Sequence, residues 1–148
     1  MQEANIANKS MHIARLLDAS IGKVWEAWTD PKQIAMWWGP AGFASTIHKM
    51  NVEVGGEWLL TMYGPGGKKF PNKSIYREIV PFEKIVFEHF NPNYIATIIF
   101  EARDFKTFID WTVCFETVEL FDIVVKTFKA DEGLKENVGK LENYLIPD

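Results

Sequence analysis

Apolar and polar residues follow two different periods along the chain, and each change of period marks an expected element. The segment at residues 11–17 predicts a first strand. Helical spacing follows it: Ser20 is a suitable N-cap residue, and Val24, Ala27 and Trp28 fall on one side of the turns that come next. The sequence therefore predicts a strand that leads directly into a short helix.

A second short helix is expected immediately after the first. Asp30 is a favourable N-cap residue, and Pro31 suits the first helical turn, where its missing N–H is not needed. Ile34, Trp37 and Trp38 share the apolar side of this helix. The Gly-Pro pair that follows is expected to end it.

From residue 44 onward the apolar period changes to two, which predicts six further strands. They are expected at residues 45–52, 57–63, 74–80, 84–90, 94–102 and 106–116. Short segments rich in glycine, proline and asparagine separate them. Because such short turns join successive strands, the strands must be antiparallel.

After residue 117 the helical period returns. Two segments are expected, at 118–128 and 131–145, with a break near Ala130. The second segment carries one apolar stripe, made of Leu134, Val138, Leu141 and Leu145. Four charged residues of this segment are expected to face water: Lys135, Glu136, Lys140 and Glu142.

This order of elements predicts an α+β fold in which a curved antiparallel sheet of six to seven strands wraps around a long C-terminal helix, with two short helices after the first strand. Antiparallel strands curl under their own twist. Because one helix rarely fills the concave side of such a sheet, we expect a cavity between the helix and the sheet. The connections are short and no repeat or linker interrupts them, so one domain is expected over residues 1–148.

Two adjacent tryptophans, Trp37 and Trp38, are followed at once by a glycine-rich loop. Adjacent helical side chains point about 100° apart, so the two rings cannot enter the same pocket. One alternative is that both rings pack in the core. The other is that Trp38 and Phe43 form a lid over the cavity, with Gly39 and Gly42 allowing the loop to move.

Alternation also assigns strand residues to the face that looks toward the C-terminal helix. On the last strand, Trp111 and Val113 share one face, whereas Asp110 and Thr112 share the other, so the apolar set points inward. Most such residues form core, but aromatic rings also line small-molecule pockets. The candidate lining residues are Trp38, Phe43, Trp58, Met62, Tyr76, Glu78, Phe87, His89, Trp111, Val113, Val138 and Leu141.

Glu78 and His89 are the polar members of this candidate set. Glu78 shares a strand face with Tyr76, and His89 shares one with Phe87. If both faces look inward, the carboxylate and the imidazole meet in an apolar setting and could serve as general acid and base. The alternative is that Glu78 faces solvent or pairs with a nearby Lys or Arg.

The composition narrows the function classes. The 148 residues are 47% apolar, 24% charged and 14% aromatic, which is typical of a globular domain with many rings for a core or an apolar pocket. The net charge of −4 and the scattered basic residues argue against nucleic-acid binding. No stretch is apolar enough to predict a membrane span, and the first residues lack the apolar region of a signal peptide, so a cytoplasmic protein is expected.

The sequence predicts neither a metal nor a cofactor. His12, His48 and His89 lie on different expected strands, without a metal-binding spacing. Cys114 is the single cysteine, which excludes a zinc site built on several cysteines. The segment GPGGKK at 64–69 lacks the spacing and the following helix of a phosphate-binding loop, so it is interpreted as a hairpin turn.

Several segments along nearly the whole chain resemble one known family. They are ARLLDAS at 14–20, VWEAWTDP at 24–31, WWGP at 37–40, VGGEW at 54–58, YREIVP at 76–81 and FKADEGL at 128–134. Together they resemble the branch of the START-like (SRPBCC) superfamily that is named after the activator of the ninety-kilodalton heat-shock protein ATPase. The resemblance implies the helix-grip fold of that superfamily, which birch-pollen-allergen-like proteins share.

The chain departs from the family pattern at one place. Just before the double glycine the family usually has an acidic residue, one further residue and then Arg, whereas this chain has Asn51 and Glu53 there. The resemblance leaves the function open between three classes. They are a domain that binds a small apolar or amphipathic molecule, a chaperone-accessory interaction domain, and an enzyme of the cyclase or hydrolase kind. The lack of a catalytic motif favours binding, and the sequence leaves open whether the protein is a monomer or a homodimer.

Overall fold

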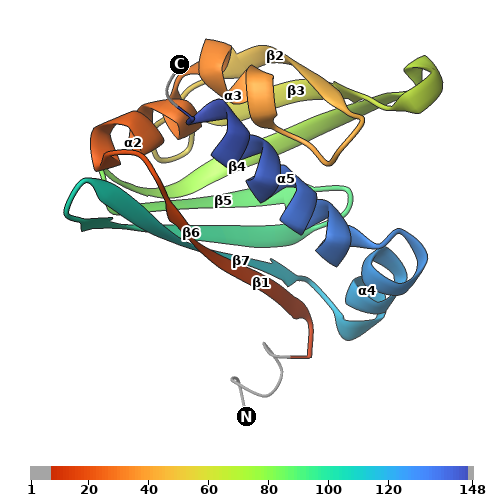
Figure 1. Ribbon diagram of the computed structural model, residues 1–148. Helices are drawn as coiled ribbons and strands as arrows, with labels where there is room; N and C mark the ends of the chain where they lie inside the picture. The colour runs from red at the N-terminus through yellow and green to blue at the C-terminus, as the bar shows by residue number, and fades with distance from the viewer. Residues whose placement is uncertain (1–7, 147–148) are drawn as a thin grey trace.

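Seven strands form one antiparallel sheet in the order β1-β7-β6-β5-β4-β3-β2 (Figure 1). They are β1 (Ser10–Leu17), β2 (Ala44–Met50), β3 (Glu57–Tyr63), β4 (Lys69–Val80), β5 (Lys84–Phe90), β6 (Tyr94–Arg103) and β7 (Lys106–Phe115). The computed structural model describes residues 8–146. Residues 1–7 and 147–148, which include the two ends of the expected domain and the first part of the segment considered as a signal peptide, lie outside the described residues.

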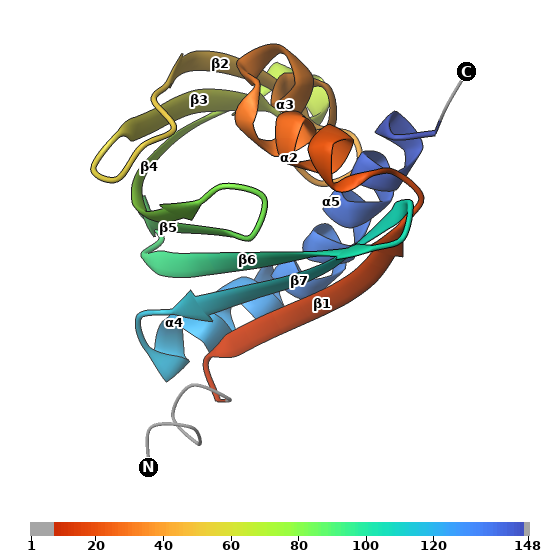
Figure 2. The same cartoon turned by 90° about the vertical axis from the view of Figure 1, so that its left-hand side faces the viewer.

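The helices occupy the concave side of the sheet and its ends. They are α2 (Ile21–Thr29), α3 (Pro31–Trp37), α4 (Val118–Asp122), the π-helical segment η2 (Ile123–Thr127) and α5 (Ala130–Tyr144), with a short 3-10 turn, η1 (Pro65–Gly67). The sheet curls, α5 runs across its concave side, and α2 and α3 lie at one end of α5 while α4 lies at the other (Figure 2). This confirms the predicted α+β architecture.

The start of α3 follows the predicted capping chemistry. The Asp30 side chain accepts a hydrogen bond from Lys32 N at 2.9 Å, and Pro31 occupies the first turn. Ser20 stands at the N-cap of α2, although its side chain makes no capping hydrogen bond. Each short helix buries its predicted apolar side against the sheet, with Val24 and Ile34 fully buried.

Strand β4 begins five residues earlier than predicted. Pro71 lies inside it, in a segment that the sequence analysis did not assign to a strand. Residues 69–72 pair with β3 alone, and the pairing with β5 begins only at Lys73. Proline removes a backbone donor, which an edge segment tolerates. The predicted boundaries of β3 and β5 are confirmed.

The helical end of the chain differs from the prediction in its first half. Instead of one regular helix over 118–128, α4 passes into the π-helical η2, and Lys129 takes a left-handed conformation with φ 55° before α5 begins. The apolar stripe of α5 is confirmed, since Leu134, Val138 and Leu141 are buried. Trp111 and Val113, on the inner side of β7, are buried as predicted.

Candidate functional site

Most of the predicted lining residues lie on the inner side of the sheet or on α5. Nine of them are buried: Trp38, Trp58, Tyr76, Phe87, His89, Trp111, Val113, Val138 and Leu141. Phe43 and Met62 are half-buried at the rim, where the ring centroid of Phe43 lies 5.7 Å from that of Phe70. Only Glu78 lies on the outside of the sheet. The fold therefore brings the aromatic candidates together but separates them from the predicted acid.

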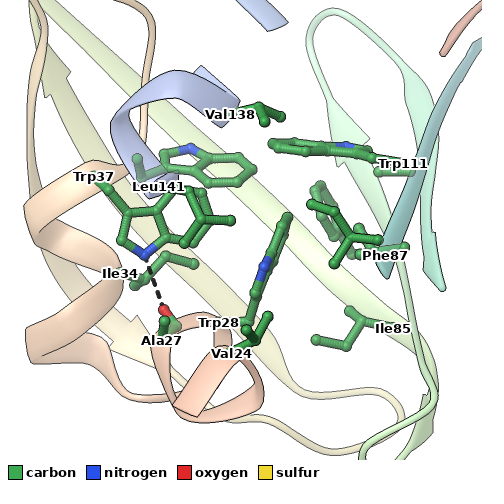
Figure 3. Close-up of a cluster of buried hydrophobic side chains, with 14 of the residues drawn as sticks. Val24, Ala27, Trp28, Ile34, Trp37, Ile85, Phe87, Trp111, Val138 and Leu141 are labelled. Carbon is green, nitrogen blue, oxygen red and sulfur yellow. Dashed lines mark hydrogen bonds between the residues drawn. The ribbon is translucent and has the colours of Figure 1, made fainter. Parts of the chain in front are cut away.

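Five tryptophans, Trp28, Trp37, Trp38, Trp58 and Trp111, form a cluster beneath α5, and Trp38 lies at its centre. Its ring centroid is 4.8 Å from that of Trp58, 5.6 Å from that of Trp111 and 5.9 Å from that of Trp28. Its ring is nearly parallel to that of Trp111, with an interplanar angle of 23°. Val138 of α5 lies next to Trp111 (Figure 3). In this structure the rings occupy the space in which the sequence predicts a cavity.

The adjacent Trp37 has a different role, which the backbone of α2 explains. The carbonyl of Ala27 would normally accept from the N–H of residue 31, but Pro31 has none. Trp37 Nε1 donates to this carbonyl at 3.0 Å (Figure 3). Trp37 and Trp38 are both buried, as one of the two alternatives predicts, and Trp37 closes a helix end whose carbonyl has lost its usual partner.

Polar atoms inside the cluster have no such partner. Nε1 of Trp28, of Trp58 and of Trp111 is buried without a hydrogen-bond acceptor among the described residues. Asn137, next to Val138 on the inner side of α5, is buried as well, and its Oδ1 has no donor in the same part of the chain. A buried polar group left unpaired costs about 1–3 kcal/mol. The interior beneath α5 is therefore lined mainly by apolar side chains but contains several polar atoms that lack a hydrogen-bond partner.

The loop 39–43, which directly follows Trp38, is hydrogen-bonded to α5. Lys140 Nζ donates to the carbonyl of Phe43 at 2.9 Å and to that of Pro40 at 3.4 Å, and Ala41 N donates to Glu136 Oε1 at 3.3 Å. The prediction that Lys140 faces water is therefore wrong. Partial burial lowers the pKa of Lys140, because it disfavours the charged amine.

The predicted acid–base pair of Glu78 and His89 is wrong, because Glu78 lies on the outer face of the sheet. The register between β4 and β5 shifts between Tyr76 and Glu78, so that Tyr76 pairs with Phe87 but Glu78 pairs with Val86. This bulge turns Glu78 outward, where its carboxylate pairs with Lys84 Nζ at 3.1 Å. The stated alternative, a surface ion pair, is therefore what the structure contains, and the carboxylate does not meet His89.

His89 is buried at the end of β5, away from any carboxylate partner. Its ring stacks on Tyr94 with centroids 4.5 Å apart, Nδ1 lies 2.8 Å from the carbonyl of Pro92, and Nε2 lies 2.6 Å from Oδ1 of Asn72. Oxygens at both nitrogens favour the protonated ring, but burial has the larger effect and lowers the pKa of His89. Burial likewise raises the pKa of Tyr94 and of Tyr76.

Two hollows open on the surface, away from the tryptophan cluster. One, of about 420 Å³, lies over β2, β3 and β4 and includes His48, Thr61 and Lys73. The other, of about 400 Å³, lies between the end of β1 and the C-terminal half of α5 and includes Asp18 and Asn143. None of the predicted lining residues borders either hollow. A molecule bound beneath α5 would therefore have to displace a side chain.

The described residues contain neither a membrane-spanning helix nor a group of metal-ligating side chains. Within residues 8–146, no helix combines the length and the apolarity needed to cross a membrane. In the same part of the chain, no three side chains of His, Cys, Asp or Glu gather closely enough to hold a metal ion. Cys114 is half-buried and makes no disulfide.

A curved antiparallel sheet that grips one C-terminal helix is the helix-grip architecture of the START-like superfamily. Within it, the sequence profile of the family described as Activator of Hsp90 ATPase homolog 1-like protein matches residues 18–145, and the chain belongs to this family. The resemblance drawn from the sequence motifs is thereby confirmed. Among proteins of curated function, none matches the sequence.

Solved structures from bacteria share the fold. A protein from Arthrobacter aurescens is 24% identical, with a TM-score of 0.89 over 95% of this chain and 88% of that chain. A protein from Nitrosomonas europaea is 21% identical, with a TM-score of 0.85 over 94% and 95%. An AHSA1-like protein from Aeromonas hydrophila is 20% identical, with a TM-score of 0.71 over 90% and 93%. At these identities the likeness is one of fold.

Proposed function

We propose that this protein is a cytoplasmic binding protein that holds a small apolar or amphipathic molecule between α5 and the sheet. The observation that carries the proposal is the set of four unpartnered polar atoms in a buried, otherwise apolar interior. A fold that needed this interior only as core would gain stability by pairing or removing those atoms. A bound molecule with matching polar groups would satisfy them.

The proposed lining combines residues predicted from the sequence with one that was not. The predicted members are Trp38, Trp58, Phe87, Trp111, Val138 and Leu141. Asn137 adds the polar atom on the helix side. Small-molecule sites have this character, since apolar and aromatic walls provide affinity and a few polar groups fix the orientation of the ligand.

Native and denaturing mass spectrometry of the protein as purified from cells would test this proposal. Extra mass that survives native conditions and disappears on unfolding is the expected result. Asn137→Leu should reduce the retained fraction, because it removes the buried carboxamide at similar volume. Asn143→Leu, the same change at an exposed position of α5, should leave it unchanged. A clean mass for the protein, both as purified and after incubation with a cell extract, would contradict the proposal.

A second function, a chaperone-accessory interaction domain, is favoured by the family description and by one surface. The outer side of β6 exposes Ile95 and Ile99, and Phe105 in the turn that follows is almost fully exposed. Apolar residues of this kind gather at protein–protein contacts. The test is the ATPase rate of the ninety-kilodalton heat-shock protein with and without this protein. An increase that Ile99→Glu abolishes supports this function, and an unchanged rate rejects it.

A further inference from the structure

Trp38 occupies the position that a ligand beneath α5 would need. It contacts the three tryptophans whose N–H groups have no acceptor, namely Trp28, Trp58 and Trp111. Moving this one ring aside would therefore open a space bordered by three rings that each carry an unpartnered donor. Displacing any of the other three would instead remove one of those donors from the wall.

The attachment of Trp38 allows its ring to leave while its backbone stays in place. Trp38 N donates to Ile34 O at 2.9 Å, and Trp38 O accepts from Ser45 Oγ at 3.0 Å. The loop that follows contains two glycines with positive φ, Gly39 at +106° and Gly42 at +84°. Glycine adopts such angles without strain and can leave them as easily, so the loop can lift without breaking the anchors of Trp38.

Side chains of α5 hold that loop closed. Lys140 donates to the carbonyls of Phe43 and Pro40, and Glu136 accepts from Ala41 N. These contacts join residues about a hundred positions apart in sequence, and they link α5 directly to the loop that follows Trp38. Opening the loop requires the hydrogen bonds from Lys140 to the carbonyls of Phe43 and Pro40 to break, and these two bonds are here called the latch.

The surroundings define the chemistry of the molecule that could replace the ring. An indole N–H only donates, so the molecule must offer hydrogen-bond acceptors to Trp28, Trp58 and Trp111. The nearly parallel Trp111 ring favours a planar aromatic system of about the size of an indole. The buried polar residues in the described part of the chain are Ser74, His89, Thr107 and Asn137. With no Lys or Arg among them, a buried carboxylate would lack a counter-charge.

We propose that Trp38 is a displaceable ring that fills the binding site in the free protein, and that the ligand is a neutral, planar, fused-ring compound bearing carbonyl oxygens. This inference rests on the proposed function, because it names the ligand class and the opening device of that same site. On binding, the ligand ring takes the place of Trp38, and its oxygens accept from the unpartnered indole N–H groups.

The experiment is a titration of the ¹⁵N-labelled protein with coumarin, followed through the six tryptophan indole N–H signals. Single Trp→Phe variants assign the signals. Coumarin, a neutral fused ring with a carbonyl, should move at least one of the Trp28, Trp58 and Trp111 signals downfield, as a new hydrogen bond does. The Trp37 signal should stay in place, because its N–H already donates to Ala27. Naphthalene, of the same ring size without an acceptor, should cause no downfield displacement, and coumarin-3-carboxylate should bind more weakly than coumarin.

Lys140→Met tests the latch. The substitution keeps the apolar stem and removes both donated hydrogen bonds, so opening becomes easier and coumarin should bind about fivefold to tenfold more tightly. Lys135→Met, at an exposed position of the same helix, should leave the affinity unchanged. Thermal unfolding of both variants shows whether each is folded. The coumarin titration of the unsubstituted protein does not depend on the stability of either variant.

Three results would overturn the inference: no coumarin binding to the unsubstituted protein or to Lys140→Met, binding that leaves the three indole signals unmoved, or no gain in affinity in Lys140→Met relative to Lys135→Met. Its failure is separable from that of the proposed function. If coumarin fails while native mass spectrometry retains a cellular ligand, the binding function stands and the ligand class is wrong. If both experiments are negative, both proposals fall.

Discussion

The two faces of the sheet satisfy their polar groups in opposite ways. On the outer face, polar and charged side chains hydrogen-bond across neighbouring strands: His12 with Asp110 at 2.6 Å, and Arg77 with Glu88 at 2.8 Å. On the inner side, the indole N–H groups of Trp58 and Trp111 on the sheet, and of Trp28 on the covering helix α2, have no partner among the described residues. The outer face thus holds paired charged groups, and its one buried polar side-chain atom without a partner among residues 8–146 is Ser10 Oγ, whereas the inner side holds several such atoms close together.

Solvent explains why this contrast matters for function. An outer side chain that loses its partner can turn to water, so its pairing adds little free energy and carries little information. A buried N–H has no such alternative, and leaving it unpaired costs about 1–3 kcal/mol. A structure that bears this cost at several adjacent residues is best understood as a site that something else completes.

The largest effect expected from this contrast is on stability. Trp111→Ala should lower the free energy of unfolding by about 3–5 kcal/mol, because it removes a fully buried ring and leaves a cavity between β7 and α5. Thr112→Ala, one residue along on the outer face, should cost about 1 kcal/mol or less. Urea unfolding followed by circular dichroism measures both. Comparable losses in the two variants would remove the distinction between the faces.

A smaller difference separates two tryptophans of the helices that cover the inner face, Trp37 on α3 and Trp28 on α2. Trp37→Phe should destabilise the protein by about 1–3 kcal/mol more than Trp28→Phe, because it leaves the Ala27 carbonyl buried without a donor. Trp28→Phe removes a similar part of a ring, but its N–H has no acceptor to lose. The same urea titrations provide the values. Equal losses would mean that water already satisfies the Ala27 carbonyl.

His89 adds a pH-dependent difference between inner and outer histidines. Burial lowers the pKa of His89 below that of an unfolded histidine, which is about 6.5, so the unfolded chain takes up the proton first as the pH falls. The stability that His89 contributes is therefore present above about pH 6.5 and is lost as the pH falls toward the folded-state pKa. Unfolding at pH 7.5 and pH 5.0 should show this loss, which His89→Gln reduces. His48→Gln, at an exposed histidine, serves as the control.

The sequence predicts those features of this contrast that depend on residues close together in the chain, and it does not predict those that depend on residues far apart. Alternation alone places Trp111 and Val113 on the inner face, and the boundaries of β3 and β5 follow from local turn residues. Asn137 was missed although its signal is present, since it lies three residues after Leu134 and four before Leu141, on the same helical stripe. A polar residue on an apolar stripe predicts a buried polar group.

Other features depend on contacts that no local pattern contains. The bulge that turns Glu78 outward exists only in the pairing of β4 with β5. Strict alternation takes no account of this bulge and therefore predicts Glu78 on the inner face, which is wrong. Lys140 reaches the carbonyl of Phe43, 97 residues earlier, so its burial depends on how α5 packs on the loop. The unpartnered indoles follow likewise from packing, which fixes where each N–H points.

The smallest expected effect is at an outer ion pair. Arg77→Ala should lower stability by about 1 kcal/mol or less, because the Arg77–Glu88 pair is partly exposed and both groups can be hydrated when separated. A double-mutant cycle with Glu88→Ala isolates the pair, and its coupling should shrink toward zero in 1 M salt, where the screening length is about 3 Å. A coupling above about 2 kcal/mol that survives salt would show that the outer face also depends on its polar contacts. The proposed difference between the two faces, in which only the buried polar groups of the inner side matter for function, would then be wrong.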